Sequence, residues 1–146
     1  DEKGNYFRWQ FTYYQSELLK MVNEKTGQSF ERISSIDSIQ RGVSGRIIKL
    51  KISGQSNGKD HHIVLESEYE IRRVLHPEFL YSSAFTINAN SGINRTLDKV
   101  TLTGAGWGHG VGLCQIGALG MALSGISSDD ILSHYFLSST IEKLYD

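Results

Sequence analysis

A run of glycines at residues 104–118, GAGWGHGVGLCQIGA, constrains the fold of this chain more than any other feature. Glycine recurs there at positions 104, 106, 108, 110, 112 and 117. Because glycine loses more conformational entropy on folding than any other residue, so dense a run disfavours a packed helix or strand. We therefore predict a loop in which the backbone turns tightly or another group approaches it closely.

Four side chains with varied chemistry lie within the same run: Trp107, His109, Cys114 and Gln115. An imidazole can act as acid, base, hydrogen-bond donor or ligand, and an indole offers an apolar plate for stacking on a sugar or a peptide. A carboxamide can donate and accept at once. Structural alternatives stay open: His109 holding backbone groups of the loop, Trp107 filling the core, and Cys114 as a buried small hydrophobe instead of a nucleophile.

The spacing of the glycines excludes two nucleotide-binding motifs. The dinucleotide fingerprint requires glycines at i, i+2 and i+5. Counted from the glycines at 104, 106 and 108, the third position is His109, Val111 or Leu113. The P-loop requires a lysine before its Ser or Thr, and no lysine lies between Lys99 and Lys143.

Composition indicates a soluble globular domain. The chain has 146 residues, of which 39% are hydrophobic and 21% charged, so one domain with a substantial core is expected. Its net charge of −1 creates no field that would recruit nucleic acid. No apolar stretch is long enough to cross a bilayer. Cys114 is the only cysteine, which excludes an internal disulfide and multi-cysteine zinc sites, and we expect neither metal nor cofactor.

Periodicity predicts strands at 6–13, 45–53, 61–65, 83–89 and 99–103, with 30–38 alternating weakly and a further candidate at 141–145. The strands at 45–53 and 61–65 form a predicted hairpin through a turn at 54–60. Helices are predicted at 17–22 with Ser16 as N-cap, from Ser67 with Glu70 as a capping box up to Pro77, at 113–123, and after Ser127. The fold class is α+β: a largely antiparallel sheet with a few short helices, and a glycine-rich loop leading into a helix.

Other polar residues receive structural interpretations. His61 and His62 are adjacent on a predicted strand, so their side chains face opposite ways and cannot chelate one metal. The glutamates at 66, 68 and 70 cluster at a helix start, where the macrodipole stabilises carboxylates. No two carboxylates stand out as a glycosidase-type acid and base pair.

The segment GAGWGHGVGLCQIGALGMALSGISSDDILSHYF resembles the signature of the stage II sporulation protein D family, which includes amidase-enhancer proteins of the LytB type. The Gly-Trp-Gly-His-Gly core, the Gln-x-Gly-Ala, the helix that follows and the His-Tyr-Phe all match in order. Two upstream stretches, NYFRW and IRRVLHPEFLYSSAF, resemble segments of the same family. The resemblance covers most of the chain.

This resemblance implies work on peptidoglycan outside the cytoplasm, in the bacterial cell envelope. Sporulation members resemble lytic transglycosylases, in which one carboxyl group can serve as acid and then as base. His109 would be catalytic. The implied substrate-binding residues are Trp107, Gly108, Gly110, Gln115, Ser83 and Arg8. Glycan strands and a cell-wall amidase are the implied partners, with no nucleic acid and no cofactor.

One departure from the family bears on catalysis. The catalytic glutamate of the family lies in a helical segment upstream of the region resembled here, and none of the glutamates of this chain sits in a matching motif. We therefore expect residues 1–146 to be the C-terminal part of such a domain, without its catalytic segment. Three functions stay open: a glycan-cleaving domain that is incomplete in this chain, a non-catalytic module that binds glycan or activates an amidase, and a purely structural domain of the envelope.

Overall fold

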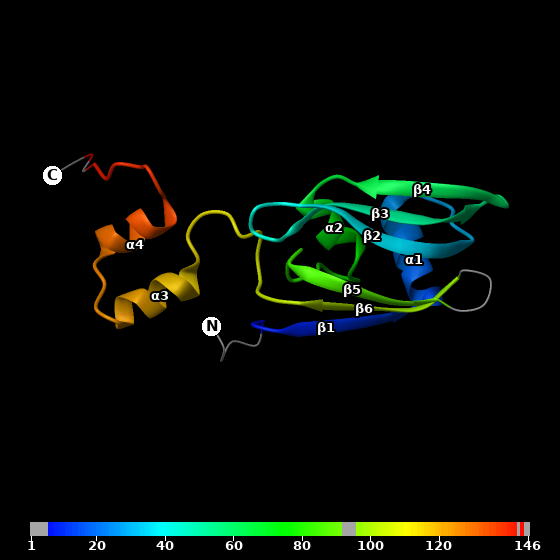
Figure 1. Ribbon diagram of the computed structural model, residues 1–146, viewed down its shortest axis with the longest axis horizontal. Helices are drawn as coiled ribbons and strands as arrows, with labels where there is room; N and C mark the ends of the chain where they lie inside the picture. The colour runs from blue at the N-terminus through cyan, green and yellow to red at the C-terminus, as the bar shows by residue number, and fades with distance from the viewer. Residues whose placement is uncertain (1–5, 92–95, 143, 145–146) are drawn as a thin grey trace. The chain divides into compact units, whose positions relative to one another are not determined.

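A computed structural model of the protein describes residues 6–91, 96–142 and 144. Its elements confirm the α+β class (Figure 1). In chain order they are β1 (Trp9–Tyr14), α1 (Gln15–Thr26), β2 (Arg32–Arg41), β3 (Ile47–Ser56), β4 (Lys59–Leu65), α2 (Glu68–Val74), β5 (Phe85–Ser91), β6 (Leu97–Gly104), α3 (Gln115–Leu123) and α4 (Ser128–Tyr135). The chain divides into two compact units, which we call the sheet unit (residues 4–109) and the helical unit (residues 110–146).

The strands of the sheet unit form two antiparallel sheets of three strands each, ordered β1-β6-β5 and β2-β3-β4. The sequence predicts the antiparallel pairing, but we expected one sheet where the structure has two. Each sheet has an alternating pattern with one apolar face, and two such faces bury more apolar surface against a shared core than a single open sheet could.

The β3–β4 hairpin turns on two residues, Asn57 and Gly58, with φ angles of 52° and 69°. Two consecutive positive φ angles define the turn whose twist matches that of antiparallel strands, and Asn-Gly is its preferred pair. The predicted turn at 54–60 is therefore too long, because its outer residues belong to the strands. Gly54 lies within β3, where the backbone of Arg32 on β2 comes so close that a Cβ would not fit.

The N-cap of helix α1 is Tyr14, two residues before the predicted Ser16. The reason is local, because the carboxylate of Glu17 accepts a hydrogen bond from the backbone N–H of Tyr14 at 3.0 Å. The helix ends at Gly27, which has a φ of 68° and donates its N–H to the carbonyl of Asn23.

Helix α2 confirms Ser67 as N-cap, since its hydroxyl accepts from the N–H of Glu70 at 3.1 Å. The return half of the expected capping box is displaced by one residue: the Glu70 carboxylate accepts from the N–H of Glu66 at 3.1 Å. The helix ends at Val74, before Pro77.

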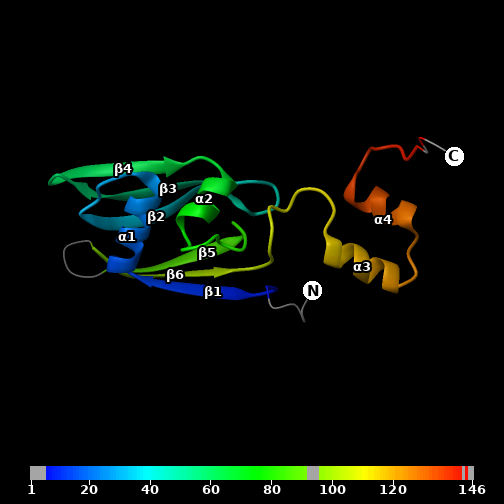
Figure 2. The same ribbon diagram turned by 180° about the vertical axis from the view of Figure 1, so that it is seen from behind.

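The core of the sheet unit lies between the two sheets and the two helices. Helix α1 contacts strands of both sheets, α2 packs on β3, and β2 lies beside β5 (Figures 1 and 2). The fully buried side chains come from both helices, from both sheets and from the segment after α2, and they include Leu18, Val22, Ile33, Leu50, Ile52, Ile71, Leu80 and Leu102. This packing fixes the ends of β1, β5 and β6, where the glycine run begins.

In the helical unit, α4 has the predicted N-cap, with Ser127 accepting from the N–H of Asp130 at 3.2 Å. Gly117 on α3 lies against the Tyr135 hydroxyl of α4, so no Cβ would fit there. In the stretch 141–145, the described residues 141, 142 and 144 form no strand, and 143 and 145 lie outside the described residues. No helix in the described part of the chain is long and apolar enough to cross a membrane.

Candidate functional site

The glycine run forms a loop with a regular alternation of backbone conformations. The φ angles are 72° at Gly106, 106° at Gly108, 71° at Gly110 and 78° at Gly112. Residues other than glycine are strained in this left-handed region of φ, so the backbone follows this path only with glycine at every second position. The predicted tight loop is confirmed.

Hydrogen bonds from the loop fasten it to the neighbouring segments of the sheet unit. The N–H of Ala105 donates to the carbonyl of Ala84 at 3.0 Å, and the N–H of Gly108 donates to the carbonyl of Tyr81 at 2.8 Å. The indole N–H of Trp9 donates to the carbonyl of Gly106 at 3.0 Å. The path of the loop up to Gly108 is therefore fixed by β1 and by the segment before β5.

Gly104, the first glycine of the run, has a different role. It ends β6 and pairs in register with Trp9 on one side and Phe85 on the other. The ring of Trp9 lies over Gly104 so closely that a Cβ there would overlap it. This is the close approach that the sequence predicts for part of the run, and it brings the indole within reach of Gly106.

Three aromatic side chains gather where the loop meets the start of β1, and we call Tyr6, Tyr81 and Trp107 the aromatic platform. The rings of Tyr6 and Trp107 have centroids 6.1 Å apart, and those of Tyr6 and Tyr81 are 4.8 Å apart with an edge-to-face geometry. Trp107 is 68% exposed and Tyr6 46% exposed, so the interpretation of Trp107 as a core residue is wrong. The platform presents apolar rings to solvent from a backbone that hydrogen bonds hold in place.

The other predicted site residues are distributed over both units. His109 is exposed at the end of the sheet unit, and Gly108 is fastened beside Trp107. Gly110 and Gln115 belong to the helical unit, where Gln115 is the exposed first residue of α3. Cys114 is exposed, and its sulfur caps α3 by accepting from the N–H of Gly117 at 3.4 Å, so the expectation of a buried hydrophobe is wrong.

Ser83 is placed in the interior and not on the platform. Its exposed fraction is 0%, and its carbonyl accepts from the N–H of Ile47 at 2.9 Å, which joins the segment before β5 to β3. Within the described residues its hydroxyl oxygen has no hydrogen-bond partner. The neighbouring Ser82 hydroxyl instead donates to the carbonyl of Ala105 at 2.8 Å and accepts from the N–H of Ala84.

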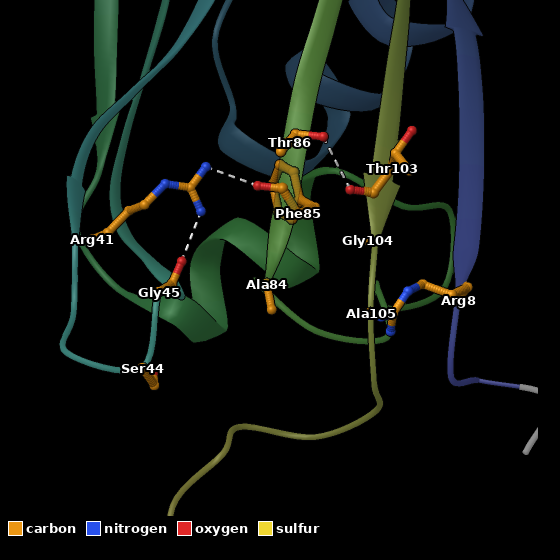
Figure 3. Close-up of a pocket in the computed structure, with 10 residues that line it drawn as sticks. All are labelled: Arg8, Arg41, Ser44, Gly45, Ala84, Phe85, Thr86, Thr103, Gly104 and Ala105. Carbon is orange, nitrogen blue, oxygen red and sulfur yellow. Dashed lines mark hydrogen bonds between the residues drawn. The ribbon is translucent and has the colours of Figure 1, made fainter. Parts of the chain in front are cut away.

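Arg8 lines a cavity of about 360 Å³ at the end of the two sheets, next to the first residues of the loop. The side chains that shape it are Arg8, Arg41, Ser44, Phe85, Thr86 and Thr103 (Figure 3). Arg41 reaches from β2 and donates to the carbonyls of Gly45 at 2.7 Å and Phe85 at 2.8 Å. Arg8 lies over the ring of Phe7, with its guanidinium carbon 4.0 Å from the ring centroid.

Arg72 holds the segment that carries Tyr81 of the platform. Its guanidinium donates to the carbonyls of Leu80 at 2.8 Å and Tyr81 at 3.1 Å, and lies 3.5 Å from the Glu68 carboxylate. These bonds fold the segment after α2 back along the helix and set the position of Tyr81. His76 lies under the same ring, 6.1 Å between centroids, and burial lowers the pKa of its imidazole.

Sequence reasoning missed Tyr6, Tyr81 and Arg41 as surface residues of this region. Tyr6 was visible as part of an aromatic-rich strand and of the resembled stretch NYFRW, and Tyr81 as part of the resembled stretch before the loop. Arg41 carried no signal, because its place in the cavity depends on how β2 packs beside β5. As for metals, the described residues bring no three His, Cys, Asp or Glu side chains together in a way that could hold an ion.

Two curated relatives come from Bacillus subtilis (strain 168). Stage II sporulation protein D is 43% identical to this chain over 49 residues, which cover 34% of this chain and 14% of the relative. The amidase enhancer is 24% identical over 133 residues, which cover 83% of this chain and 18% of the relative. The chain therefore spans only a small part of the length of either protein. Both similarities indicate a relationship to proteins of this kind.

A family model covers a larger and continuous part of the chain. The family is described as "Domain of unknown function (DUF8618)", and its model matches residues 1–112. The match includes all six strands, the first two helices, and the glycine loop as far as Gly112. With its sheet unit and the platform-bearing loop inside the match, the chain belongs to the family described as Domain of unknown function (DUF8618).

Proposed function

We propose that this chain is a cell-wall domain of the bacterial envelope, placed outside the cytoplasm, that binds the glycan strands of peptidoglycan. The observation that carries the proposal is the aromatic platform, in which the exposed rings of Trp107 and Tyr6 lie beside the partly buried ring of Tyr81. The names of the two relatives, a sporulation protein and an amidase enhancer, support a role at the cell wall.

The platform has the properties that sugar binding requires. A sugar ring has an apolar face that packs on an aromatic ring, and a tryptophan adds one hydrogen-bond donor at its edge. Trp107 is exposed, yet the backbone beside it is held by the bond from Gly108 to Tyr81. A side chain on a backbone that is already held in place loses less conformational entropy on binding than one on a mobile loop, which favours affinity.

The remaining predicted residues would serve the same ligand. Gly108 and Gly110 would allow the strand to approach the backbone, and His109 and Gln115 would donate or accept hydrogen bonds from sugar hydroxyls and acetamido groups. Arg8 and Ser83 complete the set, with Ser83 acting from the interior through the segment that it fastens. If the glycan is cleaved, His109 would assist a general acid supplied by the upstream segment of the full domain, of which residues 1–146 would be the C-terminal part.

A second function, activation of a cell-wall amidase, is favoured by the extent of one similarity. The match to the amidase enhancer covers 83% of this chain, whereas the match to the sporulation protein covers 34%. Large apolar side chains of the helical unit are also exposed within that unit, among them Leu123 and Leu137 at 80% and 83%. In this function the glycan would be the site of docking and the amidase would be the partner.

A sedimentation assay with purified peptidoglycan sacculi tests the proposal. Wild-type protein should co-sediment, and Trp107→Ala should bind about five- to thirtyfold more weakly, since stacking on one aromatic ring contributes on the order of 1–2 kcal/mol. Tyr69→Ala is the matched control, because Tyr69 is 64% exposed but lies on α2, where its ring contacts Phe79 and belongs to no platform pair. Equal binding by wild type and Trp107→Ala would refute the platform as the glycan site.

A coupled assay separates the two functions. Release of stem peptide by a purified cell-wall amidase is measured with and without this protein, alongside reducing-end or anhydro-sugar formation without amidase. Faster amidase action with no glycan cleavage would identify the activating module. Cleavage without amidase would identify the enzyme, whereas neither effect, together with retained binding, would leave a glycan-binding domain.

A further inference from the structure

We propose that the cavity between Arg8 and Arg41 binds the terminal carboxylate of a short peptide with small apolar side chains. Two guanidinium groups line the cavity from different strands, Arg41 from the end of β2 and Arg8 from the segment before β1 (Figure 3). Among the residues that the structure describes, no carboxylate lines it. The described lining is therefore positively charged, on a chain whose net charge is −1.

Arg41 is held in a fixed position before any ligand binds. Its two terminal nitrogens donate to the carbonyls of Gly45 and Phe85, at 2.7 and 2.8 Å. Carbonyl groups leave the positive charge of the guanidinium uncompensated, whereas a carboxylate partner would neutralise it. None of the ion pairs among the described residues involves Arg41 or Arg8. Since an ordered guanidinium loses little freedom on binding, this geometry favours an anionic ligand.

Hydroxyl groups complete the polar part of the cavity. The Thr86 hydroxyl donates to the carbonyl of Thr103 at 3.4 Å, and the Thr103 hydroxyl accepts from the side chain of Gln10 at 3.2 Å. Ser44 lies in the turn between β2 and β3, which the bond from the Gly45 N–H to the carbonyl of Gly42 holds at 2.9 Å. These groups can bond a carboxylate oxygen or the last amide of a peptide.

The walls of the cavity select the kind of anion. Ala84, Phe85 and Ala105 give it an apolar surface, and its volume of about 360 Å³ is near the lower limit of small-molecule sites. A carboxylate beside a methyl side chain matches this combination of cations and small apolar walls. A phosphodiester polymer, with charge along its whole length, would leave the apolar walls uncovered.

The source of such a peptide rests on the proposed function, because the glycan of the cell wall carries short stem peptides that end in alanine carboxylates. The cavity is lined by residues next to those of the platform along the chain, because Arg8 follows Tyr6 by two residues and Ala105 precedes Trp107 by two. A glycan on the platform would thus have its peptide branches close to the cavity. The cavity is a second recognition site, for peptide and not for sugar.

The test uses N-acetyl-D-alanyl-D-alanine as probe, titrated into isotope-labelled protein and followed by amide NMR. The expected result is a shift of the amides of Ser44, Gly45, Thr86 and Ala105, which line the cavity. The same peptide with a C-terminal amide, which lacks the charge, should bind at least about tenfold more weakly, as loss of a charge-assisted hydrogen bond predicts. Added salt should weaken the binding of the free acid.

Arg8→Gln and Arg41→Gln should each weaken binding of the free acid at least about tenfold, and Lys20→Gln, which removes an exposed charge on α1, should not. If Arg41→Gln fails to fold, Arg8→Gln decides, because Arg8 is exposed and its hydrogen bond is to its neighbour Phe7. Equal affinity for the acid and the amide, shifts that map elsewhere, or shifts with inorganic phosphate but not with peptide would each overturn the proposal. The titration contains no glycan, so its outcome is independent of the sacculus assay.

Discussion

Replacement of Gly104 by alanine should destabilise the sheet unit by about 2 kcal/mol, although alanine is the smallest possible change. Its Cβ would overlap the ring of Trp9, which is 7% exposed and packed in the core. Overpacking of this kind costs about 1–3 kcal/mol. Displacement of the ring also breaks its bond to the Gly106 carbonyl, a loss of about 1 kcal/mol, while the reduced freedom of the unfolded chain returns about 0.4–1 kcal/mol.

Equilibrium urea unfolding gives the measurement. The chain has two tryptophans, so a Trp107→Phe background leaves Trp9 as the single reporter of the core. With a slope of about 1.5–2 kcal/mol per molar urea, the midpoint should fall by roughly 1 M. Gly42→Ala is the matched control, because a Cβ there would meet Ile48 at 3.6 Å, an ordinary contact, and its midpoint should change little.

A double-mutant cycle tests the stated cause. The cycle is followed by far-ultraviolet circular dichroism, because Trp9→Phe removes the tryptophan reporter. Trp9→Phe has a smaller ring and lacks the donor, so it should reduce the cost of Gly104→Ala by at least about 1 kcal/mol. Additive effects of the two substitutions would show that the overlap with Trp9 is not the reason for the loss. An unchanged midpoint for Gly104→Ala would refute the packing argument altogether.

Three further predictions concern the support of the platform. Arg72→Met should lower the free energy of unfolding by about 3 kcal/mol, because it leaves the partly buried Glu68 carboxylate and the Leu80 carbonyl unpaired, and thermal unfolding will show whether this loss occurs. Burial lowers the pKa of His76, so the unfolded chain binds the proton more readily; stability should be full above about pH 6.5 and decrease as pH falls through the lower folded-state pKa. His76→Asn should flatten this pH dependence in urea melts, whereas the exposed His62→Asn should not, and equal slopes would contradict the assignment. Ser82→Ala should cost about 1–2 kcal/mol because its hydroxyl makes two hydrogen bonds, while Ser83→Ala, which removes a buried hydroxyl without a described partner, should be neutral or stabilising; the reverse order of their melting temperatures would contradict this reading.

Local signals in the sequence predicted the elements well, because they depend on neighbouring residues. Alternation located the strands, Ser67 and Ser127 located two helix starts, and the turn composition of residues 54–60 marked the hairpin. The division into two sheets was not predictable in the same way. Alternation shows that a strand has an apolar face, but not which other strand shares its sheet or which layer covers it.

The candidate site was predictable to the same extent: its local backbone conformation could be predicted, but the residues brought to it from distant parts of the chain could not. The glycine pattern fixed the loop, since the backbone conformation at Gly106 and Gly108 depends on those residues themselves. The exposure of Trp107 was undecided, because an indole suits both core and surface. Tyr81 is 26 positions before Trp107, and only the fold of the segment after α2 brings its ring to the platform.

In the loop, the glycines with positive φ angles determine the path of the backbone, and the residues between them carry the side chains that would face a ligand. Glycine is required at 106, 108, 110 and 112, but positions 107, 109 and 111 have no such backbone requirement. At these three positions the φ angle does not restrict which side chain the backbone can carry. Members of the family could therefore diverge in ligand preference by single substitutions at alternate positions, and a library varied only at Trp107, His109 and Val111 would sample that divergence on one scaffold.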